Sequence, residues 1–180
     1  MRIFAYCMAS GLAAIQQAMG GFIVTAPPYT AATFDPHLLE GRDFLYFRLH
    51  GLAQINRAMF GDGPDGGLVP ALYIEQLDGL NLSGAVVLLA NCYAPDSLFP
   101  AAFYRAGARA VFAGAGTNYT AQGATVAGVD LLARWLLRYL QVGLPPDRAL
   151  RQAKMRLLLT SFRAADRDAL AFKLMEGNYA

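Results

Sequence analysis

Hydrophobic residues in this chain gather into short runs that are separated by turns rich in glycine and proline. Several runs lack the alternation of a half-exposed strand, so we expect strands that are buried on both faces. These predicted strands cover residues 2–8, 22–26, 43–49, 85–90 and 110–113. Predicted helices lie between or after the strands, at residues 12–19, 69–77, 98–106, 126–142 and 145–160, with a short further element at 168–175.

This alternation predicts one α/β domain over residues 1–180, a three-layer α/β/α sandwich around a mostly parallel sheet. The 180 residues are enough to bury a core of ordinary size. In the helix at 126–142, apolar residues recur at spacings of three and four. Asp130 and Arg134 are expected on its opposite, solvated face, in the order that favours an ion pair. The four glycines within residues 61–67 predict a mobile loop.

Composition narrows the possible functions. A chain that is 56% hydrophobic and 16% charged is not a disordered one. The net charge of +2, with scattered arginines, gives no surface for nucleic acid. No apolar stretch is long enough to span a membrane, and we interpret the apolar start as a core strand rather than a signal peptide. We therefore expect a cytoplasmic protein with reduced cysteines, and we expect no metal and no cofactor.

Two reactive side chains directly follow predicted central strands. His50-Gly51 comes after residues 43–49, and Cys92 comes after residues 85–90 and Asn91. In parallel α/β sheets, reactive groups collect beyond the carboxyl ends of the strands. If the two strands are neighbours, His50 can help to generate a Cys92 thiolate, and the N–H groups of Gly51 and Cys92 can form an oxyanion hole. A structural histidine and a buried cysteine would explain the same residues, so both interpretations are open here. By contrast, Cys7 is expected in the core and His37 on the surface.

Five segments together resemble the caspase-like cysteine peptidases, the group of caspases, metacaspases, gingipains and separases, and are most similar to bacterial CHAT domains. Residues 44–51 and 86–92 carry the His-Gly pair and the cysteine, and the other segments are residues 99–111, 140–154 and 172–178. The resemblance covers roughly residues 43 to 180. It implies a hydrolase, a thiol protease that cleaves a protein or peptide substrate through an acyl-enzyme. It also implies that His50 is the base or proton carrier, that Cys92 is the nucleophile, and that Gly51 and Cys92 hold the oxyanion.

The sequence departs from this family at the positions that set specificity. Ala90 stands where metacaspases carry aspartate and caspases carry glutamine, and Ala94 stands where caspases carry glycine. Neither specificity is therefore carried over. Asp96 either supplies negative charge to a pocket or is simply solvated, and residues 114–119 form either a substrate-contact loop or a plain turn. The candidate substrate-binding residues are Ala90, Asp96, Gly116, Thr117 and Asn118.

Other functions fit the same residues. The chain could be a regulatory or binding module on a caspase-like fold, with the dyad present but unused, or a thiol amidase for small molecules. A flavodoxin-like receiver would require an acidic pair after the first strand, where this chain has Ala9-Ser10. The length leaves little room for a sensor domain, so a regulatory partner protein is the expected source of control.

Overall fold

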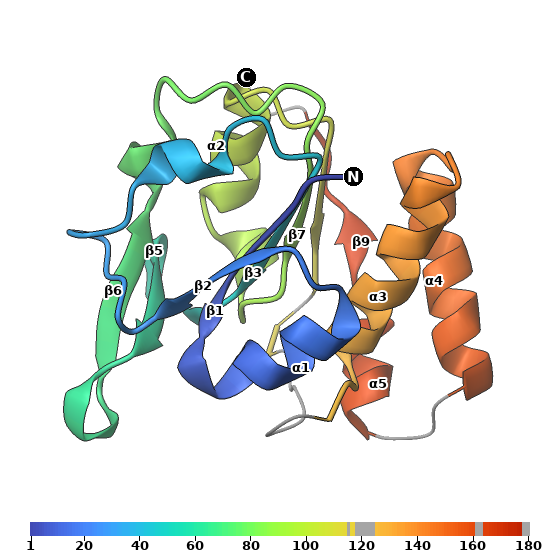
Figure 1. Ribbon diagram of the computed structural model, residues 1–180, viewed down its shortest axis with the longest axis horizontal. Helices are drawn as coiled ribbons and strands as arrows, with labels where there is room; N and C mark the ends of the chain where they lie inside the picture. Colours follow the sequence, from blue (N-terminus) through green and yellow to red (C-terminus); the bar gives the residue numbers. More distant parts are fainter. Residues whose placement is uncertain (115, 118–124, 161–163, 178–180) are drawn as a thin grey trace.

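A computed structural model of the chain describes residues 1–114, 116–117, 125–160 and 164–177. At its centre is a six-stranded sheet in the order β2-β1-β3-β7-β8-β9 (Figure 1). Neighbouring strands from β2 to β8 are parallel, and β9 is antiparallel to β8. The strands are β1 (Ile3–Met8), β2 (Phe22–Ala26), β3 (Phe44–Arg48), β7 (Val86–Leu89), β8 (Ala110–Ala113) and β9 (Lys173–Leu174). The predicted α/β class and mostly parallel sheet are confirmed.

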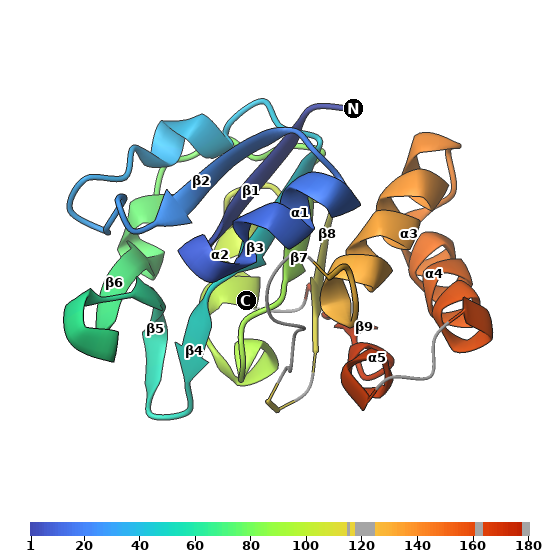
Figure 2. The same ribbon diagram turned by 60° about the horizontal axis from the view of Figure 1, so that its bottom comes forward.

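A second, smaller sheet is antiparallel, in the order β4-β5-β6. Its strands are β4 (His50–Leu52), β5 (Ile55–Asp62) and β6 (Leu68–Tyr73). Figure 2 shows β4 following directly from the end of β3. The small sheet is therefore attached to the point where a central strand leaves the main sheet.

Five α-helices are described. They are α1 (Leu12–Ala18), α2 (Phe99–Arg105), α3 (Val129–Gln141), α4 (Pro146–Thr160) and α5 (Ala164–Ala169). Short 3-10 turns occupy Ala9–Gly11, Pro36–Leu39, Pro64–Gly66, Ile74–Leu77 and Ala94–Asp96. Figure 1 shows α3 and α4 on one side of the molecule and β5 and β6 on the other. Among the described residues, no helix combines the length and the apolar character that a membrane span requires.

Both faces of the main sheet are buried, which explains why its strands lack alternation. In β3, Leu45 and Phe47 belong to the core that also contains α2 and the small sheet, and Phe47 packs against Phe103 at a ring-centroid distance of 5.1 Å. The intervening Phe44 and Tyr46 belong to the core with α1, α3, α4 and α5. Because successive side chains of a strand point to opposite faces, a strand that is covered on both sides is mostly apolar.

The sequence prediction was wrong for residues 69–77. They form strand β6 and the turn Ile74–Leu77, not one helix, and no strand was predicted where β5 lies. Pro70 suggested the first turn of a helix, but it lies in an edge strand of the small sheet, where proline is tolerated. Antiparallel pairing of β6 with β5 fixes this segment as a strand, and it outweighed the helix signal of Pro70. Similarly, residues 168–175 divide between the end of α5 and β9.

The predicted solvated face of α3 also needs correction, because Asp130 is fully buried. Its Oδ2 lies 3.2 Å from Arg48 Nη1 at the end of β3, and its Oδ1 accepts a hydrogen bond of 2.7 Å from the Tyr46 hydroxyl. Arg134 instead donates to the backbone carbonyls of residues 17 and 18. The helical spacing predicted both charged residues on one solvated face. In the folded chain, Asp130 instead packs against the buried guanidinium of Arg48.

Candidate active site

The His-Gly and Asn-Cys segments leave the main sheet side by side. β3 and β7 are parallel neighbours in which Phe47 lies opposite Leu89, and the Ala90 N–H donates to the Phe47 carbonyl over 2.8 Å. His50 and Cys92 each come three residues after that Phe47–Leu89 pair. Since parallel strands rise by the same length per residue, both segments emerge at the same edge of the sheet.

Gly51 brings the two segments into direct backbone contact. A methyl group at this position would lie 2.0 Å from the Cys92 carbonyl oxygen and 3.0 Å from its carbonyl carbon. Only glycine permits so close an approach. The two residues whose N–H groups were predicted to form an oxyanion hole are therefore adjacent.

The two cysteines occupy different environments. Cys92 is a reduced and partly exposed cysteine. The chain turns sharply after it, because Tyr93 has φ 55° and its N–H donates to the Gly116 carbonyl over 2.8 Å. A left-handed conformation is unfavourable for an aromatic residue and is often found at functional sites. Cys7 is fully buried, and burial raises the pKa of its thiol to about 12. The prediction that Cys7 is a core residue is confirmed.

His50 is half-buried and contacts a carboxylate that the sequence did not reveal. Its Nε2 lies 3.1 Å from Asp62 Oδ1, and Asp62 Oδ2 accepts a longer hydrogen bond of 3.5 Å from Ser10 Oγ. Asp62 falls within residues 61–67, which were predicted to be a mobile loop, but it is the last residue of β5. The other histidine, His37, is exposed as predicted.

Beneath the site, a buried polar network joins three parts of the fold. Arg48, two residues before His50, contacts Asp130 at the start of α3 and donates to the Gly11 carbonyl over 3.3 Å. A methyl group at Gly11 would come within 2.6 Å of Arg48 Nη1, so the turn after β1 packs closely on this guanidinium. Burial raises the pKa of the Asp130 carboxyl, while Arg48 and the Tyr46 hydroxyl oppose that shift. This network holds together the ends of β1 and β3 and the start of α3.

The candidate substrate-binding residues differ in how exposed they are. Ala90 is 4% exposed and packs in the core, so its side chain offers little surface to a substrate. Asp96 is exposed at the end of the turn Ala94–Asp96, and Thr117 is exposed as well. Gly116 is half-buried beside the turn after Cys92. Asn118 lies outside the described residues.

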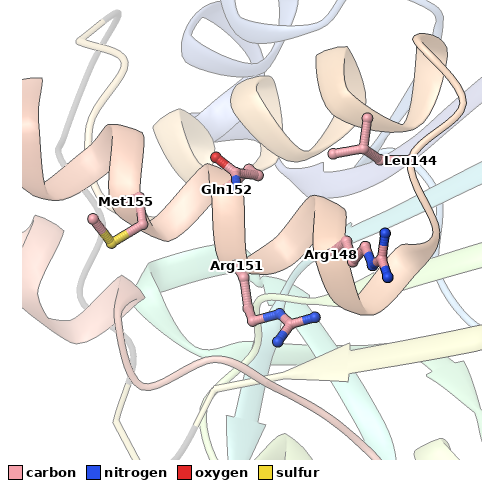
Figure 3. Close-up of a pocket in the computed structure, with 5 residues that line it drawn as sticks. All are labelled: Leu144, Arg148, Arg151, Gln152 and Met155. Carbon is pink, nitrogen blue, oxygen red and sulfur yellow. The ribbon is translucent and has the colours of Figure 1, made fainter.

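A hollow of about 530 Å³ lies elsewhere, on the outer surface of α4 (Figure 3). The residues that line it all come from α4 and the turn before it: Leu144, Arg148, Arg151, Gln152 and Met155. They include neither a thiol nor an imidazole, so this hollow cannot supply the chemistry that His50 and Cys92 offer. Among the described residues, no cluster of three or more metal-binding side chains occurs.

A scan of the chain against models of protein families found no match, and a search of curated proteins found no match either. The site combines a thiol, an imidazole with a carboxylate partner, and the backbones of two segments in contact. Such groups are components of nucleophilic attack on a carbonyl carbon.

Proposed function

We propose that this chain is a cysteine endopeptidase of the caspase-like class, most similar to CHAT domains. The observation that carries the proposal is the backbone contact between Gly51 and Cys92, at the carboxyl ends of two neighbouring parallel strands. This contact brings the backbones of Gly51 and Cys92 together, and it sets His50 and Cys92 at the same edge of the main sheet. The helices on both faces of the sheet also suit the three-layer sandwich of that class, and the short closing strand β9 suits the resemblance of residues 172–178.

In the proposed reaction, Cys92 Sγ loses its proton to His50 and attacks the carbonyl carbon of a peptide bond. The N–H groups of Gly51 and Cys92 stabilise the oxyanion of the tetrahedral intermediate. The C–N bond then breaks, the amine leaves with the proton from His50, and an acyl-enzyme remains on Cys92. Water, deprotonated by His50, hydrolyses this thioester and restores the thiol. A reducing compartment such as the cytoplasm would keep the nucleophile in its active form.

The first test compares the two thiols of the native protein. At pH 7.5 a thiol with a pKa of about 12 has about three thiolates in 100,000 molecules, and Cys7 is also fully buried. We expect iodoacetamide to label Cys92 at least about 100-fold faster than Cys7, as measured by mass spectrometry of the digested protein. Equal labelling of the two would refute an activated thiol at Cys92.

The second test is a digest of a peptide library, in which new termini are identified by mass spectrometry. Wild type and Cys7→Ala, which serves as the matched control, should both cleave the library, whereas Cys92→Ala should not. Cleavage that survives Cys92→Ala would remove Cys92 as the nucleophile. Hydrolysis of small amides with no cleavage of peptides would instead indicate the amidase, and no hydrolysis of either would favour a binding module.

A further inference from the structure

We propose that Asp62 is a positioning residue for His50. Asp62 fixes the tautomer of the imidazole, so that Nδ1 is the nitrogen that exchanges a proton with Cys92. The effect on turnover rests on the function proposed above, whereas the tautomer follows from the contact between His50 and Asp62 alone.

The contact determines which ring nitrogen carries the hydrogen. Asp62 Oδ1 lies 3.1 Å from His50 Nε2, which is hydrogen-bond distance. An ionised carboxylate only accepts hydrogen bonds, so Nε2 must be the donor. In the neutral imidazole, Nδ1 then carries the lone pair and is the only ring nitrogen that can take a proton.

The backbone places this carboxylate independently of the thiol. His50 pairs with Phe60 across β4 and β5, which sets Asp62 at a fixed register beside the imidazole. One residue earlier, a methyl group at Gly61 would lie 2.3 Å from the Ala26 side chain and 2.6 Å from the Ala26 carbonyl oxygen. β5 is therefore packed tightly against the end of β2. The base and its partner thus share one small sheet, while Cys92 comes from the main sheet.

The exposure of the pair limits the size of the effect. The side chains of His50 and Asp62 are 39% and 41% exposed, so water screens their attraction. We expect Asp62→Asn to lower kcat by about tenfold to a hundredfold, with little change in KM, because the ring orientation matters in the transition state more than in substrate binding. Asp65→Asn removes the same charge from the neighbouring turn Pro64–Gly66 and serves as the matched control.

The direct test is NMR of the two histidines, because the sequence contains only two. Long-range ¹H–¹⁵N spectra of the wild type should show His50 as the Nε2–H tautomer. Asp62→Asn should reduce the Nε2–H population of His50, since the carboxylate that accepts from Nε2 is gone. His37, which pairs with Glu40, should keep its wild-type spectrum in either variant, and Asp65→Asn should leave both histidines unchanged.

An Nδ1–H tautomer in the wild type would overturn the proposal. So would an unchanged Nε2–H population of His50 in Asp62→Asn, or a wild-type kcat for that variant in an active enzyme. If the tautomer behaves as expected in wild type and variant but the protein cleaves no peptide, the proposed function fails and the positioning of His50 by Asp62 stands. Asp62→Glu restores the carboxylate and should recover part of the Nε2–H population even if Asp62→Asn is less stable.

Discussion

Replacing Gly51 by alanine tests the contact on which the proposed site depends. The added methyl group would lie 2.0 Å from the Cys92 carbonyl oxygen, whereas real contacts of this kind almost never fall below 3.0 Å. Both sides of this contact are backbone, so no flexible side chain can move away. We expect the two segments to separate by about 1 Å, and a misplacement of that size between catalytic groups costs about 100-fold in turnover.

The assay measures kcat, the rate of Cys92 alkylation and the melting temperature for wild type, Gly51→Ala and Gly67→Ala. Gly67 is the control, because a methyl group there would meet only the Pro64 carbonyl oxygen at an ordinary 3.4 Å and its φ of −75° suits alanine. We expect Gly67→Ala to match the wild type and Gly51→Ala to lose turnover and stability. If Gly51→Ala keeps wild-type turnover and melting temperature, the two backbones are not in contact and the proposed oxyanion hole fails with them.

Two further predictions concern buried polar groups. Arg48→Met should destabilise the protein by about 3–5 kcal/mol at pH 8, because it leaves the Asp130 carboxylate buried without its counter-ion. The loss of stability should be smaller at pH 5. Burial already raises the pKa of the Asp130 carboxyl, and removal of Arg48 raises it further. As the pH falls, the carboxyl of the variant is therefore protonated in the native state, and the cost of an unpaired buried charge disappears. Urea unfolding followed by fluorescence at the two pH values checks this, and an equal loss at both would contradict it. Tyr104→Phe should lower the free energy of unfolding by about 1–2 kcal/mol in the same assay. The Tyr104 hydroxyl donates to the Met175 carbonyl over 2.7 Å and accepts from the Val111 N–H over 3.2 Å, and the variant loses both bonds. An unchanged unfolding midpoint would show that these bonds do not form.

The elements that the sequence predicted well are those whose signal is local. Strands such as Val86–Leu89 are continuous apolar runs because both faces of the sheet are covered, and that pattern is visible without any knowledge of the partners. The sequence left open whether the strands before His50 and Cys92 are neighbours, and the parallel pairing of β3 and β7 shows that they are. From these strands and the rule that reactive groups follow strand ends, His50 and Cys92 could be selected among all other polar residues.

Residues whose surroundings depend on strand pairing or on tertiary packing could not be predicted. Asp62 lies beside His50 only because β4 and β5 pair, and β5 had no recognisable signal next to a glycine-rich segment. Asp130 has the spacing of a solvated helix face, yet the start of α3 lies over the buried guanidinium of Arg48. In each case the partner of a polar residue is determined by the folded structure and leaves no signal in the local sequence.

The sequence by itself therefore determined the fold class, the core position of Cys7 and the placement of His50 and Cys92 after central strands, because hydrophobic burial leaves a pattern along the chain. Only the tertiary structure decided that Gly51 packs on Cys92, that Asp62 is the partner of His50 and that Ala90 belongs to the core. These features rest on contacts between chain segments, and such contacts form only when the strands take their places in the two sheets.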